Sequence, residues 1–82
     1  MAALYTAAQA AERATHWRRA LSANAAVVTA ATVRYWVTRG HLTATGLNDR
    51  GHPLYASADV ARAELATRRR ALRLVGIPER QP

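Results

Sequence analysis

The scarcity of large apolar side chains is what most limits the folds open to this chain. Half of its 82 residues are hydrophobic, but 20 of those 41 are alanine, which leaves 16 larger aliphatic residues and five aromatic ones. A domain of this length buries only about 60% of the surface that its unfolded chain exposes, and each alanine adds little to that area. We therefore expect a single domain with a thin core, which binds its partner at an open surface rather than in an enclosed, dry pocket.

The acidic, histidine and serine residues form no catalytic or metal-binding pattern. The five acids lie in separate segments, and neither serine has a histidine and an acid at a spacing that suggests a triad. The three histidines share no ligand spacing, and the chain has no cysteine. The sequence therefore predicts no enzyme, no metal site and no cofactor.

The chain carries a large excess of positive charge. Its formal net charge is +7, because 12 basic residues, all of them arginine, face only five acids. A GC-rich genome explains arginine in place of lysine, but it does not explain why acids are scarce. Such an excess attracts phosphates and releases counterions on contact, which favours nucleic acid as the partner over a membrane surface or an acidic protein.

Two further observations bear on location. No apolar run approaches the roughly 20 residues that span a bilayer. The first residues also lack a basic leader followed by a continuous apolar stretch, so they do not indicate a signal peptide. We expect no membrane association and a cytoplasmic protein associated with the nucleoid.

Capping residues and helical spacing predict two helices in the first half of the chain. Thr6 is a good N-cap for a helix over residues 7–21, and the serine and asparagine of residues 22–24 favour a break. Thr29 caps a second helix over about residues 30–39, which Gly40 ends in the left-handed region. Val28 and Val33 have the spacing of a hydrophobic staple.

The second helix has two different faces. Val33, Trp36 and Val37 form an apolar stripe, which predicts that this side packs on the core. The opposite side is polar and rich in hydrogen-bond donors, and it carries Ala31, Arg34, Tyr35, Thr38 and Arg39.

The second half of the chain predicts a hairpin and a third helix. Extended pieces at residues 42–45 and 53–55 flank a turn-rich stretch, and Pro53 favours an edge position for the second piece. Ser57 or Asp59 begins a helix that runs to about Arg73. Its buried line is predicted to comprise Ala58, Ala61, Leu65 and Leu72. We expect one domain over residues 1–75 and a frayed tail over residues 76–82.

Three motifs in order resemble one family of DNA-binding proteins. The segment VTAATVRYWVTRGHL at residues 28–42 has a Thr-Val-Arg core, two aromatic residues and an Arg-Gly-x-Leu ending. GHPLY at residues 51–55 is followed by SADV at 57–60, and YTAAQAA precedes them at 5–11. These segments resemble the recognition helix, the wing with the helix behind it, and the opening helix of the MerR superfamily and its small excisionase-like relatives. The resemblance covers roughly residues 4–65.

The resemblance implies a mainly α fold with a small β-hairpin, that is, a winged helix-turn-helix of three helices plus a wing. One departure concerns the distance between the first two helices. The family places about eight residues between the opening helix and the recognition cap, whereas residues 13–27 add a longer stretch here. A lengthened first helix is the expected consequence.

The resemblance also implies roles for the outward side chains of the second helix. Arg34 would fork onto guanine O6 and N7 or grip a phosphate, Tyr35 would bond a phosphate through its hydroxyl, and Arg39 would reach the backbone. Ala31 and Thr38 would meet thymine methyls or base edges. Thr29 would place the helix N-terminus where free N–H groups favour an anion.

On the wing, the implied contacts to phosphates or the minor groove are Asn48, Arg50 and His52. Further candidate phosphate contacts, each weaker, are Thr6, Arg18, Arg19 and Tyr55.

Several residues have a second interpretation. Arg34 and Arg39 would also serve simply as solvated residues of a helix face. We assign Trp36 to the core, and Trp17 to the core or to a surface or dimer contact. Tyr55 is a core or hinge residue or else a phosphate contact, and residues 68–70 are a solvated helix end or a second phosphate-binding patch.

The sequence thus predicts sequence-specific binding to double-stranded DNA by a small transcription regulator. An excisionase, which directs site-specific recombination, is the first alternative. A protein-interaction module, such as an antirepressor or adaptor on the same scaffold, is the second. The expected assembly is a homodimer or a cooperative multimer on DNA, with a recombinase or another protein as a further partner.

Overall fold

The computed structural model describes residues 3–74, and their side chains as far as Arg69. Three helices and three short strands form a winged helix-turn-helix, as predicted. The predicted tail at 76–82 lies outside the described residues, and the extent of the domain over 1–75 stays a prediction. The elements are β1 (Leu4–Tyr5), α1 (Ala7–Leu21), α2 (Ala30–Thr38), β2 (Gly46–Leu47), β3 (Pro53–Ala56) and α3 (Ser57–Leu74).

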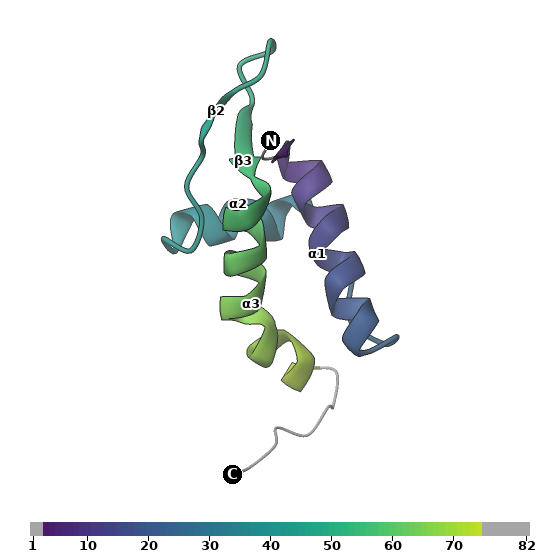
Figure 1. Ribbon diagram of the computed structural model, residues 1–82. Helices are drawn as coiled ribbons and strands as arrows, with labels where there is room; N and C mark the ends of the chain where they lie inside the picture. Colours follow the sequence, from purple (N-terminus) through teal and green to yellow (C-terminus); the bar gives the residue numbers. More distant parts are fainter. Residues whose placement is uncertain (1–2, 75–82) are drawn as a thin grey trace.

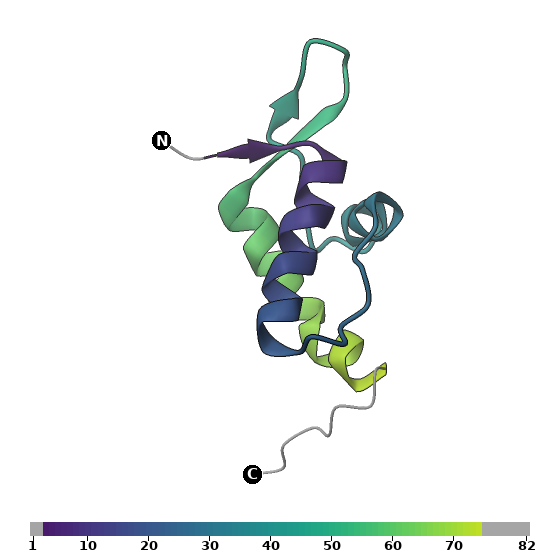
Figure 2. The ribbon, with the colours of Figure 1, turned by 90° about the vertical axis from the view of Figure 1, so that its right-hand side faces the viewer.

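Helices α1 and α3 run side by side along the molecule, α2 crosses them, and the β2–β3 hairpin projects beyond one end (Figure 1). Turned by 90°, the same ribbon shows β1 lying across the base of that hairpin (Figure 2). The hairpin is therefore the wing, and α2 follows α1 as the second helix of the helix-turn-helix. None of the described helices is both long enough and apolar enough to cross a membrane.

Helix α1 begins and ends where its local sequence predicts. The Thr6 hydroxyl accepts the Gln9 N–H at 3.2 Å, while the Gln9 side chain accepts the Thr6 N–H at 2.9 Å, so both orphan donors are satisfied. At the other end the Ser22 N–H donates to the Arg18 carbonyl. Residues 13–21 of the interposed stretch continue the helix, which confirms the lengthened first helix. Residues 22–29 then form the connection to α2.

Helix α2 is capped at both ends as predicted. The Thr29 hydroxyl accepts the Thr32 N–H at 3.2 Å. Gly40 has a φ of +83°, its N–H donates to the Val37 carbonyl, and the His41 N–H donates to the Trp36 carbonyl at 2.8 Å. This pair of bonds is a Schellman motif, which needs a left-handed residue that glycine supplies without strain.

The sheet has the order β1-β3-β2, so β3 is its central strand. The prediction of an edge position for the second extended piece, which is β3, is wrong. Pro53 is tolerated because it is the first residue of β3 and pairs only with Leu47 of β2, whereas β1 pairs with the other end of the strand, at Tyr55 and Ala56. Strand β1 itself was not predicted, and β2 begins after the predicted extended piece at 42–45.

Helix α3 begins at Ser57 as predicted, but its buried face differs from the prediction. Ala58, Ala61 and Leu65 are exposed, with Leu65 at 62%, and the side chain of Leu72 lies outside the described residues. The inward face instead carries Val60, Ala63 and Glu64. The prediction followed apolar residues only, whereas the buried face includes the acidic residue Glu64, which is paired with an arginine of α1.

The core lies where the three helices and β3 meet. Trp36 and Val33 of α2 are buried in it, as predicted, with Leu42 and Val60. Buried alanines of α1 bring that helix close to its neighbours, and Trp17 is half-buried against the same cluster. Val37 was predicted to belong to the buried stripe, but it lies at the rim and is 36% exposed.

Candidate nucleic-acid interface

The outward face of α2 is the first component of the site. Arg34 and Tyr35 are exposed, Tyr35 at 56%, while Val33 and Trp36 beside them in sequence are buried. The helical repeat separates the two sets, since burying one side of a nine-residue helix turns the other side to solvent. The predicted contact residues on this exposed face, together with the N-cap, are Thr29, Ala31, Arg34, Tyr35, Thr38 and Arg39.

The charges on this face and on the wing have no ion-pair partner in the part of the chain that the structure describes. Helix α2 contains no acidic residue, and within residues 3–69 the structure gives no ion pair to Arg34, Arg39 or Arg50. The guanidinium carbon of Arg39 lies 5.8 Å from the centre of the Tyr35 ring, a cation–π contact that holds both groups on one side of the helix. These guanidinium groups are therefore available to phosphates or base edges.

The wing is shaped by one asparagine. The side-chain oxygen of Asn48 accepts the N–H groups of Arg50 and His52, both at 2.9 Å. Gly51, with a φ of +78°, donates its N–H to the Asn48 carbonyl. These bonds of half-buried Asn48 fix the turn of the wing. Arg50 and His52 are exposed on that turn. Only the amide nitrogen of Asn48 is left for the predicted contact with DNA.

An open groove of about 620 Å³ brings these elements together. It lies between the first turn of α1, the first turn of α2 and the wing, so it collects Thr6, Arg34, Arg50 and His52 from three parts of the chain. Neither α1 nor α2 has an acid in its first turn, and their N-terminal N–H groups and dipoles therefore favour an anion there. The lining residues are Thr6, Ala7, Ala8, Ala30, Arg34, Asn48, Arg50, His52 and Pro53.

Four of these lining residues were not predicted, namely Pro53 of β3 and three alanines. Ala7, Ala8 and Ala30 have no functional side chain, and they contribute the main chain of the first helical turns. The signal that was available is their position directly after the caps Thr6 and Thr29, where N–H groups have no partner within the helix.

Two predicted phosphate contacts are wrong. Arg18 is 6% exposed and its Nε lies 3.2 Å from a carboxylate oxygen of buried Glu64. Tyr55 is 2% exposed in the core. Neither side chain can reach a duplex, because the fold encloses both; for Tyr55 the alternative interpretation as a core residue holds.

Arg19 is exposed but lies apart from the groove. It belongs to the last turn of α1, whereas the groove is at the first turn, and its Nε donates to the Ala25 carbonyl at 3.2 Å. A phosphate contact by Arg19 would therefore be separate from those of the groove.

The basic cluster at residues 68–70 includes an arginine that is already bound to a carboxylate. Arg68 is bound by both carboxylate oxygens of Glu64, and hydrogen bonding to that carboxylate raises the pKa of Arg68 above its ordinary value. Arg69 also has an interaction partner, and the side chain of Arg70 lies outside the described residues. Because its guanidinium group is bound to Glu64, Arg68 is not available to the predicted second phosphate-binding patch.

An exposed basic helix in a helix-turn-helix, beside an arginine-bearing wing, defines the class of winged helix-turn-helix DNA-binding proteins. The comparison with known families agrees. The model of the MerR HTH family of regulatory proteins matches residues 22–77, and the chain belongs to this family. Its general function is therefore DNA binding in transcription regulation, and the family is not one of enzymes. No curated protein and no solved structure matches the chain.

The matched segment contains α2, the wing and the described part of α3. It begins after α1, so the resemblance of residues 5–11 to the family's opening helix is not covered by the match.

Proposed function

We propose that this protein is a sequence-specific regulator that places α2 in the major groove of double-stranded DNA and the β2–β3 wing against the neighbouring backbone or minor groove. The observation that carries the proposal is the row of exposed guanidinium and hydroxyl groups on α2, which form no ion pair within the described residues. One of them, Arg34, also lines a groove shared with the wing.

The dimensions of α2 suit this placement. An α-helix with its side chains is about 10–12 Å across, and the major groove of B-DNA, about 12 Å wide, admits such a helix. In helix-turn-helix proteins the N-terminal part of the second helix reaches base edges. This supports base contacts by Ala31 and Arg34. We keep Thr38, at the other end of α2, as a further base contact, and Tyr35 and Arg39 as phosphate contacts.

The groove beside α2 suits the passage of one DNA strand. Two helix N-termini, Arg34 from α2 and Arg50 from the wing converge on it. A phosphate held there would fix the position of α2 along the duplex, because it would contact both the helix and the wing. Thr6, whose hydroxyl already accepts the Gln9 N–H, retains its own proton for such a contact.

The test is selection of bound sequences from a random duplex library, followed by titration of the selected duplex at several salt concentrations. We expect an enriched motif and an affinity that falls steeply with salt, with a logarithmic slope of about −0.9 for each phosphate contacted. No enrichment together with salt-insensitive binding would instead support the protein-interaction module.

The selected site also separates regulation from recombination. A genomic copy beside a promoter fits the transcription regulator, whereas copies confined to the ends of an integrated element fit the excisionase. No feature of the described residues favours the excisionase, so the regulator is the function we propose.

A further inference from the structure

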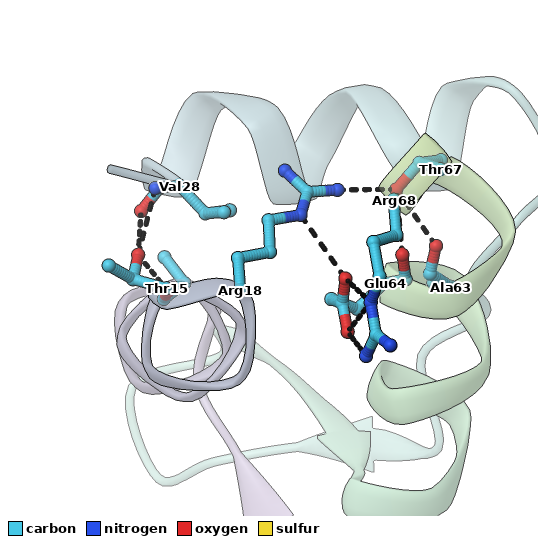
Figure 3. A network of polar contacts seen from close by, with 8 residues as sticks. Thr15, Arg18, Val28, Ala63, Glu64, Thr67 and Arg68 are labelled. Atoms are coloured by element: carbon cyan, nitrogen blue, oxygen red, sulfur yellow. Dashed lines mark hydrogen bonds and ion pairs between the residues drawn. The ribbon is translucent and has the colours of Figure 1, made fainter. Parts of the chain in front are cut away.

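The C-terminal part of α1 contacts the segment that leads into α2, α2 itself, and α3. We use the term α1 extension for residues 13–21, the part of the interposed stretch that is helical. Figure 3 shows two of its side chains, Thr15 and Arg18, reaching away from α1 in different directions, one toward Val28 and the other toward α3.

Thr15 holds the residue that leads into α2. Its hydroxyl accepts the Val28 N–H at 2.8 Å, and it lies within donating distance of the carbonyls of Ala11 (2.8 Å) and Val28 (3.3 Å). Val28 is 4% exposed and directly precedes the N-cap Thr29. The Thr15 hydroxyl therefore satisfies the N–H group of buried Val28, a residue that belongs to no helix or strand.

Arg18 connects all three helices. Its Nε pairs with Glu64 of α3 at 3.2 Å, and a terminal nitrogen donates to the Thr67 hydroxyl at 2.8 Å. Its guanidinium carbon also lies 5.6 Å from the centre of the Trp36 ring of α2. The Arg18 and Glu64 side chains are 7% and 0% exposed, so these bonds form in a region of low dielectric, where their geometry is strongly enforced.

The apolar contacts of α1 by themselves define its packing angle only weakly. Its buried side chains in the core are alanines at positions 10, 11 and 14, with Trp17 half-buried against the same cluster, and such small side chains interlock less with a neighbouring helix than larger ones do. Hydrogen bonds and buried ion pairs are directional, and their best-attested use is to select one arrangement among several of similar stability.

We propose that Thr15 and Arg18 are positioning residues for DNA readout, which fix the direction of α2 relative to α1 and the wing without touching DNA. We call these two side chains and their bonds to Val28, Glu64, Thr67 and Trp36 the brace. The inference rests on the proposed function, and it adds a role for the stretch by which this chain departs from the family pattern.

The first test uses Arg18→Met and Thr15→Val, with Thr15→Ser as the conservative variant. Glu64 keeps Arg68 as its partner in Arg18→Met, and methionine fills a similar volume, so the protein should remain folded. The readout is the ratio of affinities for the selected duplex and for a scrambled duplex of the same length. We expect this ratio to fall about tenfold in both variants, equivalent to losing one well-placed base contact.

Three accompanying results are expected. Affinity for the scrambled duplex changes less than about threefold, and the salt slope is unchanged, because the exposed arginines remain. Thr15→Ser retains the hydroxyl and keeps the wild-type ratio. A ratio unchanged in both Arg18→Met and Thr15→Val would overturn the proposal.

Val60→Ala is the control for lost stability. Val60 is fully buried on α3, and its truncation weakens the core by creating a cavity without removing a bond of the brace. We expect a lower melting temperature but an unchanged affinity ratio, measured where the protein is folded. If Val60→Ala lowered the ratio as much as Arg18→Met does, the effect would come from stability alone and the positioning role would be rejected.

A measurement without DNA separates failure of the brace from failure of the proposed function. Absence of sequence preference in the wild-type protein would reject the function. Amide hydrogen exchange still decides on the brace, because Thr15→Val should speed exchange in α2 at least about fivefold more than in α3. Equal acceleration in both helices would overturn the proposal.

Discussion

The arginines of this chain differ mainly in what surrounds each guanidinium. Arg18 is enclosed by Glu64, Thr67 and the Trp36 ring, whereas Arg34 and Arg50 are exposed beside a groove and have no acidic partner in the described part of the chain. The planar, permanently charged guanidinium suits both settings, because it offers several fixed donors to a carboxylate inside or to a phosphate outside. Residue type alone therefore does not say which arginines contact DNA.

At this scale we predict different effects for two arginines of the site. Arg34→Ala should weaken binding to the selected duplex by about 1–3 kcal/mol and relax the preference at one base position. Arg50→Ala should weaken selected and scrambled duplexes alike and reduce the salt slope by about one phosphate contact. Fluorescence anisotropy with both duplexes at several salt concentrations measures the two effects.

Arg62→Ala is the matched control for charge. Arg62 is an exposed arginine of α3, it pairs with Asp59 at 2.9 Å, and it does not line the groove. Arg62→Ala removes the same formal charge as Arg34→Ala, but at a position away from the groove. We therefore expect an affinity for DNA within about twofold of wild type. If Arg34→Ala behaved like Arg62→Ala, Arg34 would have no part in readout.

Among the elements, α2 depends on its two ends, because nine residues form too short a helix to be stable alone. Thr29 satisfies an orphan N–H at the start, and the Schellman motif around Gly40 satisfies two carbonyls at the end. These local bonds set the limits of the exposed face that we assign to DNA.

We predict that Gly40→Ala lowers the free energy of unfolding by about 1–2 kcal/mol. A Cβ at Gly40 would meet no heavy atom within 4 Å, so the loss would come from the left-handed backbone conformation (φ +83°) and not from a clash. Chemical denaturation followed by circular dichroism measures it.

Two other substitutions serve as controls for Gly40→Ala. Gly40→Asn should lose less stability, since asparagine tolerates this conformation. Gly46→Ala should have little effect, because a Cβ there also meets nothing within 4 Å and the backbone is not left-handed. Equal losses for Gly40→Ala and Gly46→Ala would contradict the explanation by strain.

At the scale of the whole molecule, the ion pairs of the described residues lie on α1 and α3 and not on α2 or the wing. Glu64 is buried between Arg18 and Arg68, and Asp59 pairs with Arg62. Those contacts involve α1 and α3, and among the described residues no acid forms an ion pair with Arg34, Arg39 or Arg50, although Asp49 directly precedes Arg50 in the wing. A net charge of +7 on so small a protein would also speed its encounter with DNA.

The size of the molecule predicts that more than one copy binds. In the proposed mode of binding, one recognition helix and one wing would cover a single short half-site, and modules of this size bury about 600–1,000 Å² on DNA. We therefore expect tight binding to need two half-sites, with the affinity for a duplex carrying one half-site at least about tenfold lower. Analytical ultracentrifugation with both duplexes measures the stoichiometry; a single copy bound equally well to both would contradict the expectation.

The sequence by itself determined the features that depend on neighbours within about one helical turn. The caps at Thr6 and Thr29, the left-handed stop at Gly40 and the outward face of Arg34 and Tyr35 all arise from such local interactions, so their pattern is visible in the chain. The motif around α2 is equally local, and it indicated the family.

Only the tertiary structure decided what depends on distant partners. Arg18 and Glu64 are 46 residues apart in the sequence. Because they pair in the interior, Arg18 is not the phosphate contact that was predicted, and the buried face of α3 includes Glu64. The pairing of β1 with β3 likewise made β3 central. Such contacts depend on how elements far apart in the chain come together, and no spacing within a single segment encodes that.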